Sequence, residues 1–246
     1  MHTPADVLAQ LLADDASRPA LTFYDDSPGP TQGERIELSR KVFATWVAKA
    51  ANALQEDYDV APGSVVRLEL PAPHWRSLYW AFAVWSVGAT VTVDPHEGAD
   101  VLVTTDPAGR AAEDADEVVA VALPALARSF GAELRSGVMD EARDLASHGD
   151  DFTPWDEPDA EDPALVADGV RTAYRALMPR AVTPGTRVLV TTDRTDTLLH
   201  QALAVWAGHG SLVIVRGGSP QAEDQRMRSE AVQRVAGPGA DLGTAD

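Results

Sequence analysis

Residues 60–66 read Val-Ala-Pro-Gly-Ser-Val-Val, and residues 182–188, 122 positions later, read Val-Thr-Pro-Gly-Thr-Arg-Val. Further segments match at nearly the same offset: 83–85 with 204–206, and 88–93 with 210–215. Each copy predicts a Pro-Gly turn, a strand, an apolar helix, a glycine and a second strand. The sequence therefore predicts an α/β fold of two related β-α-β halves, with a largely parallel sheet and helices on both faces. The alternative is that any two β-α-β units rich in Ala and Val look alike.

Hydrophobic periodicity divides the chain into strands and helices. Strands are expected at 20–25, 35–38, 65–70, 90–93, 101–104, 118–123, 186–191 and 211–215. Helices are expected at 6–13, 40–54, 74–87, 163–178, 197–206 and 221–235. Ser39 is expected to cap the second helix, because a serine hydroxyl accepts a hydrogen bond from the first turn. Residues 74–87 are apolar on nearly every side, which is typical of a helix buried between layers.

The expected domain organisation is one α/β domain over residues 1–216, with halves at about 19–125 and 163–216. Residues 137–161 are acidic and rich in turn formers, so they are expected to connect the halves along the surface. Residues 217–246 are expected to form a C-terminal helix and, from 237 on, a disordered tail.

Composition excludes several classes of function. The net charge of −18 argues against binding to nucleic acid or to anionic lipid, since both need clustered Lys and Arg. There is no cysteine, which excludes disulfides, zinc–thiolate sites and cysteine nucleophiles. The start of the chain has no signal-peptide pattern, and no window approaches the length of a membrane span. We therefore expect a soluble, cytoplasmic protein.

Three segments near the start of the chain carry recognisable patterns. Residues 36–38 (Ile-Glu-Leu) precede a helix with Ala-Ala-Asn-Ala-Leu at 50–54, residues 60–66 hold a Pro-Gly turn, and residues 85–95 read Trp-Ser-Val-Gly-Ala-Thr-Val-Thr-Val-Asp-Pro. Together they resemble the opening of adenylate-forming (AMP-binding) enzymes, which include acyl-CoA synthetases and peptide-synthetase adenylation domains. Ser64 stands where those enzymes usually have Asp. The second repeat copy, 182–216, resembles the next β-α-β unit of the same domain.

The resemblance implies the fold of the N-terminal domain of these enzymes in a truncated form, and it is closest to a short actinobacterial group. Adenylation requires a loop of Gly, Ser and Thr ending in Lys, which holds the ATP phosphates. That loop is expected between Pro163 and Leu177, but residues 167–174 read Ala-Asp-Gly-Val-Arg-Thr-Ala-Tyr. The two lysines of the chain, Lys41 and Lys49, both lie on the expected helix after Ser39. The resemblance implies that the family's adenine- and ribose-binding segments and its lid domain would lie beyond residue 246, so we expect this chain to lack them.

These departures predict a catalytically inactive relative of AMP-dependent synthetases that binds a protein partner or a small acyl or nucleotide ligand. No catalytic residue and no cofactor are expected under this hypothesis. The alternative is a noncanonical acyl-CoA ligase that uses ATP or AMP and Mg²⁺ with different residues. A third possibility is an ATP-binding subunit completed by a separate lid protein. The sequence favours no particular oligomeric state.

A small set of polar residues remains as candidates for ligand binding. Two identical hexads, Val-Leu-Val-Thr-Thr-Asp, occupy 101–106 and 188–193. Their polar ends could line a crevice at the carboxyl edge of parallel strands: Thr104, Thr105, Asp106, Thr191, Thr192 and Asp193. The alternative is that these residues only cap the turns after each strand. The hexads are 87 positions apart, so the repeat does not make them equivalent.

The histidines and the acidic run give one further candidate for ligand binding and no metal site. In the related enzymes a histidine often follows the corresponding strand near the acyl pocket, which makes His200 a candidate. A half-buried histidine on a helix is the alternative. No two histidines have metal-ligand spacing, and the acidic run at 113–117 is unlike a calcium-binding loop, so no metal site is expected. The tryptophans early in the chain are best explained by core packing.

Overall fold

The computed structural model describes residues 1–237, and residues 238–246 lie outside this description together with most of the expected tail. The chain divides into two compact units, and neither is continuous in sequence. The first unit comprises Met1, Thr45–Leu70 and Tyr79–Leu177. The second comprises His2–Ala44, Pro71–Leu78 and the described residues from Met178 onward. None of the helices among residues 1–237 combines the length and hydropathy that crossing a membrane requires.

The second unit contains a five-stranded sheet in the order β12-β10-β11-β1-β2. All neighbours are parallel except β1 and β2, which are antiparallel. Its strands are β1 (Pro19–Asp25), β2 (Arg35–Ser39), β10 (Arg187–Val190), β11 (Ser211–Arg216) and β12 (Arg234–Ala236). Its helices are α1 (Pro4–Asp15), α7 (Thr195–Ala207) and α8 (Pro220–Ser229).

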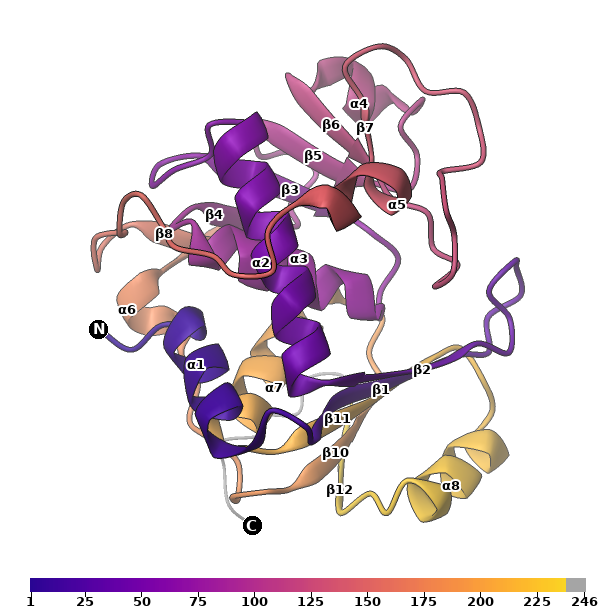
Figure 1. Ribbon diagram of the computed structural model, residues 1–246. Helices are drawn as coiled ribbons and strands as arrows, with labels where there is room; N and C mark the ends of the chain where they lie inside the picture. Colours follow the sequence, from indigo (N-terminus) through magenta and orange to yellow (C-terminus); the bar gives the residue numbers. More distant parts are fainter. Residues whose placement is uncertain (238–246) are drawn as a thin grey trace. The chain divides into compact units, whose positions relative to one another are not determined.

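Helices α7 and α8 lie on opposite faces of this sheet (Figure 1). The α8 face is an apolar cluster of Leu189, Val213 and Val215, against which Met227 of α8 packs. On the other face, the buried Trp206 of α7 donates its indole N–H to the carbonyl of Ala20 in β1 at 3.1 Å. The sheet is therefore covered on both sides, as parallel strands require.

The first unit contains a seven-stranded sheet in the order β7-β6-β5-β3-β4-β8-β9, parallel except for the β8–β9 pair. Its strands are β3 (Val65–Glu69), β4 (Thr90–Thr92), β5 (Val101–Thr104), β6 (Glu117–Ala120), β7 (Met139–Asp140), β8 (Pro163–Ala167) and β9 (Val170–Ala173). Its short helices are α4 (Arg110–Asp114), α5 (Glu141–Asp144), η1 (Leu145–Ser147) and α6 (Tyr174–Leu177). The boundary between the units falls within α2 (Arg40–Asp57) and α3 (Trp75–Ser86).

The two predicted β-α-β repeats are confirmed. One is β3-α3-β4 and the other is β10-α7-β11, and in each the two strands pair in parallel. The turns before β3 and β10 contain Gly63 and Gly185, with φ of 97° and 73°, a region that favours glycine. Residues of α3 are buried on all sides, as its sequence predicts. Ser39 accepts a hydrogen bond from the N–H of Val42 at 3.2 Å, as a cap of α2.

Two predicted helices are wrong in part. Residues 163–178 form the β8–β9 hairpin and only one helical turn, α6, because Leu165 and Val166 pair with β4 in parallel. The predicted helix at 221–235 ends with α8 at Ser229. Ala231 then has a φ of 50°, incompatible with a continuing helix, and the chain enters β12 beside β10.

The acidic connection runs along α2 as a strap, defined here as residues 146–155. Asn52 of α2 donates to the carbonyls of Gly149 and Asp151 at 3.1 and 2.9 Å. One turn further, Gln55 donates to the carbonyl of Thr153 and accepts the N–H of Trp155. The predicted surface connection therefore has fixed partners on one helix.

Candidate ligand site at a carboxyl sheet edge

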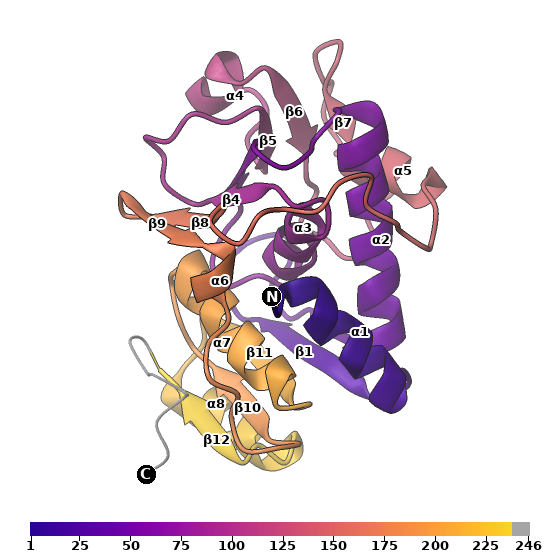
Figure 2. The same ribbon diagram turned by 90° about the vertical axis from the view of Figure 1, so that its left-hand side faces the viewer.

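The segment where the resemblance places the phosphate loop is a tight hairpin. Strands β8 and β9 lie side by side (Figure 2). They are joined by Asp168 and Gly169 alone, and Ala167 pairs with Val170. Asp168 and Gly169 have φ of 50° and 73°, which is the geometry of a two-residue type I′ turn. The N–H of Gly169 donates to the carboxylate of Asp94 at 2.7 Å, so the turn's amide already has a protein partner.

This hairpin does not fit the phosphates of ATP. A phosphate cradle needs several backbone N–H groups that converge on one point, but here the backbone around the turn pairs within the β ladder. The lysine of this unit is also committed elsewhere. Lys49 donates to the carbonyls of Ala146 and His148 and pairs with Asp150 at 2.6 Å. The residues described here therefore offer neither the loop nor its lysine.

A crevice of about 460 Å³ opens at the carboxyl edge of the five-stranded sheet. We call it the carboxyl-edge crevice. Its lining comes from the ends of β1, β10 and β11, the segment after β3 and helix α8: Ser27, Ala72, Pro73, Thr191, Thr192, Asp193, Val215, Arg216, Gly217 and Glu223.

The crevice lies where the connections of the sheet diverge. Strand β10 leads through α7 to β11 beside it, whereas β11 leads through α8 to β12 on the far side of β10. Since crossovers between parallel strands are right-handed, connections in opposite directions cover opposite faces and leave a gap between them. Open α/β sheets bind their ligands in the gap at such a switch point.

One wall of the crevice is fixed by a buried ion pair. The fully buried Asp25 accepts hydrogen bonds from the guanidinium of Arg216 at 2.9 Å, the hydroxyl of Thr31 at 2.6 Å and the N–H of Ser27 at 2.9 Å. Asp25 thereby balances the charge of Arg216. The remaining charged residues at the crevice, Asp193 and Glu223, are carboxylates.

The turn after β11 must be glycine. Gly217 and Gly218 have φ of 70° and 102°, and a Cβ on Gly217 would lie 2.8 Å from the hydroxyl of Ser27. A Cβ on Gly218 would lie 2.7 Å from the carboxylate of Asp26. The loop from β11 to α8 therefore passes directly against the end of β1.

The structure places the sequence-predicted residues in three different settings. Thr191, Thr192 and Asp193 line the carboxyl-edge crevice, and the hydroxyl of Thr192 also accepts the N–H of Arg194 at 3.1 Å. The hexad at 101–106 lies at the end of β5 in the seven-stranded sheet. There the hydroxyl of Thr104 accepts the N–H of Asp106 at 3.0 Å, and Thr105 lies between them.

His200 lies within α7, and its Nδ1 is 2.9 Å from the carbonyl of Asp196 one turn earlier. The sequence did not single out Ser27, Arg216 or Gly217, although a strand that ends in Arg-Gly-Gly is a signal for a special turn. Among residues 1–237 no group of three or more His, Cys, Asp and Glu side chains is arranged to hold a metal ion.

Comparison with solved structures defines the class of fold. An acyl-CoA synthetase of Brucella canis matches 98% of this chain with a TM-score of 0.76 at 17% identity. Acetoacetyl-CoA synthetase of Streptomyces lividans matches 96% with a TM-score of 0.73 at 16% identity, and a fatty acyl CoA synthetase of Mycobacterium tuberculosis matches 95% with a TM-score of 0.69 at 13% identity. The chain spans 48%, 42% and 48% of these proteins. It therefore has the α/β fold of the part of these synthetases that it spans.

Sequence comparison identifies the family. A TIGR03089 family protein of Mycobacterium tuberculosis is 33% identical over 241 residues, which cover 93% of this chain and 96% of that protein. The chain belongs to this family. No protein-family model matches it.

Proposed function

We propose that this protein is a binding protein on the adenylate-forming fold that does not form adenylates. The observation that carries the proposal is the two-residue turn between β8 and β9, at the position where the family resemblance requires a phosphate loop. Without that loop and its lysine, the hairpin offers no group at this place to stabilise the charge that develops as an adenylyl group is transferred.

We further propose that the carboxyl-edge crevice holds a small polar ligand. The crevice offers hydroxyls from Ser27, Thr191 and Thr192 and two carboxylates, Asp193 and Glu223. Carboxylates accept hydrogen bonds from hydroxyl and amino groups and repel phosphates. A nucleoside or another ligand rich in such donors therefore fits better than a nucleoside triphosphate.

Thermal unfolding with adenosine, AMP, ATP with Mg²⁺ and a medium-chain acyl-CoA tests this proposal. A ligand at a hundredfold its dissociation constant stabilises a protein by about 2.7 kcal/mol, a shift of several degrees in Tm. We expect adenosine to give a larger shift than ATP. Absence of a shift with every compound contradicts a small-ligand site and leaves a protein partner as the binding target.

A pair of matched variants places the ligand. Asp193→Asn should weaken the stabilisation by the ligand, whereas Asp106→Asn, at the same place in the identical hexad on the other sheet, should not. Equal effects of the two variants would show that the ligand does not use the carboxyl-edge crevice. Turnover of ATP to AMP with any carboxylic acid would support the alternative function, a noncanonical ligase.

A further inference from the structure

A second cavity, of about 480 Å³, lies at the opposite edge of the five-stranded sheet. We call it the amino-edge cavity, because the first residues of three parallel strands line it: Pro19 of β1, Arg187 of β10 and Ser211 of β11. Gln233, directly before β12, completes this row. The other lining residues are Arg18, Arg40, Gly185, His209, Gly210, Ser229, Glu230 and Ala231.

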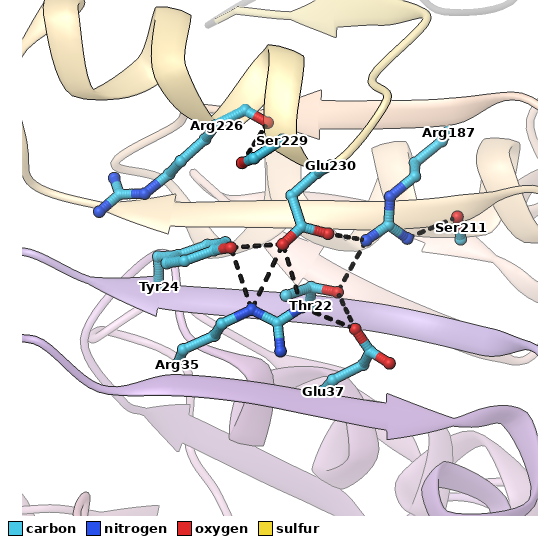
Figure 3. A network of polar contacts seen from close by, with 9 residues as sticks. All are labelled: Thr22, Tyr24, Arg35, Glu37, Arg187, Ser211, Arg226, Ser229 and Glu230. Atoms are coloured by element: carbon cyan, nitrogen blue, oxygen red, sulfur yellow. Dashed lines mark hydrogen bonds and ion pairs between the residues drawn. The ribbon is translucent and has the colours of Figure 1, made fainter.

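The cavity concentrates positive charge in an acidic protein. The whole chain has 38 acidic and 20 basic residues, yet this lining has three arginines and a histidine against one carboxylate, Glu230. Asp14, which is not part of the lining, pairs with Arg40 at 2.6 Å and lies 3.4 Å from His209. Glu230 is itself held by Arg187 and Arg35 and by the hydroxyl of Tyr24 (Figure 3). Its negative charge is therefore already shared between two guanidinium groups.

Two further arginines contribute in different ways. Arg40 is almost fully buried and pairs with Asp14 at 2.6 Å, while its other amino group donates to the carbonyl of His209 at 2.7 Å. It holds the loop before β11 in place. Arg18 is exposed at the mouth of the cavity and forms no side-chain hydrogen bond or ion pair with any residue in 1–237. Its charge acts on the nearby carboxylate of Asp15, but its guanidinium is the one in this lining that no residue in 1–237 holds in an ion pair.

Neutral donors surround these charges. Ser211 and Ser229 present hydroxyls. The Ser211 hydroxyl accepts a hydrogen bond from Arg187 at 3.0 Å, and the Ser229 hydroxyl donates to the carbonyl of Arg226 at 3.3 Å (Figure 3). Gln233 uses its amide oxygen for the N–H of Arg187, which leaves its amide N–H₂ as a donor. Guanidinium and hydroxyl donors around one cavity suit oxygens of phosphate or carboxylate groups.

We propose that the amino-edge cavity binds a small, multiply charged anion, and that Arg18 supplies its principal ion pair. The ligand carries phosphate or carboxylate groups, which share this chemistry. The proposal is independent of the carboxyl-edge crevice, since the two sites lie at opposite ends of the strands and share no lining residue.

Titration of the full chain with inorganic phosphate and, separately, with citrate tests the proposal by isothermal calorimetry and by amide chemical shifts of Gly210 and Ser211. We expect saturable binding of at least one of the two anions, with shifts at these amides. Arg18→Gln should weaken that binding about tenfold, because a charged hydrogen bond is lost. Arg110→Gln is the control, since Arg110 is almost fully exposed on α4 in the other unit.

Comparing the two anions distinguishes a phosphorylated ligand from a polycarboxylate. Binding of phosphate alone assigns a phosphorylated ligand, and binding of citrate alone assigns a polycarboxylate. The proposal is overturned if neither anion binds, if Arg18→Gln binds as well as the unaltered chain, or if Arg110→Gln weakens binding equally.

Discussion

At the scale of single residues, the burial of His74 makes the stability of the protein depend on pH. Its side chain is fully buried, its Nδ1 accepts the N–H of Arg76 at 3.2 Å, and its ring lies 4.7 Å from that of Phe23. Burial holds the pKa of His74 well below its usual value, and the charges of Arg76 and Arg216 lower it further. The imidazole is therefore neutral in the folded protein.

His74 should make the protein less stable in mild acid. Below pH 6.5 the unfolded chain protonates this histidine and the folded chain does not, so the free energy of unfolding falls as the pH falls. Between pH 7 and pH 5 the unfolded pKa of about 6.5 limits this loss to at most about 2 kcal/mol. His74→Phe should remove that part of the pH dependence in urea unfolding, whereas His96→Phe, at an exposed position, should leave it. Identical slopes for His74→Phe and the unaltered protein would show that His74 titrates normally.

Asn52 has a role that its sequence neighbours do not reveal. Its amide donates to two carbonyls of the strap that lie 97 and 99 positions away. Asn52→Ala should leave both carbonyls without this donor and cost about 1–2 kcal/mol. Hydrogen exchange should then speed up across 149–153. Lys41→Ala, at an exposed position of the same helix, should have little effect. Equal exchange in the two variants would show that Asn52 does not hold the strap.

At the scale of elements, the β8–β9 hairpin depends on its glycine. Gly169 has a φ of 73°, which disfavours residues with a Cβ, and its N–H bonds to Asp94. Gly169→Ala should lower the free energy of unfolding by about 1 kcal/mol. Gly98→Ala is a matched control, because Gly98 has no positive φ and open space around its Cα. Equal destabilisation by both substitutions would mean that the turn is not under this constraint.

The same hairpin is sensitive to acid. Backbone hydrogen bonds from His96 and Gly169 hold the pKa of Asp94 below its usual value. Asp94 therefore stabilises the fold at pH values above the unfolded pKa of about 3.9, and this stabilisation is lost as the pH falls through its lowered folded value. In Asp94→Asn the stability gained between strong acid and pH 5 should be smaller than in the unaltered chain. Superimposable acid unfolding curves would contradict this contribution.

Local patterns predicted most elements but not their partners. Strands such as 101–104 and the buried helix at 74–87 were correct, because their apolar periodicity reflects burial directly. The helix predicted at 163–178 was wrong, since an Ala-rich run resembles a helix until Leu165 pairs with Val91, more than seventy positions earlier. Strand β12 was missed for the same reason, because only its pairing with β10 defines it.

At the scale of the whole molecule, the sequence indicated some of the residues that line the carboxyl-edge crevice and not others. Thr191, Thr192 and Asp193 follow from the end of a strand, which parallel sheets place at one edge. Ser27 and Arg216 come from segments that meet only in the folded sheet, so one sequence could not assign them. The departure of residues 167–174 from a Gly/Ser/Thr-rich composition was visible from residue types, whereas the tight turn there required the register of β8 and β9.

The β8–β9 hairpin of this protein does not form a phosphate cradle. Titration of ¹⁵N-labelled protein with ATP and Mg²⁺, followed through the amide signals of residues 167–171, tests it most directly. The structure predicts that these signals do not move, because the amide of Gly169 is held by Asp94 and Ala167, Val170 and Arg171 belong to the ladder. Saturable shifts of these amides with ATP would contradict the claim.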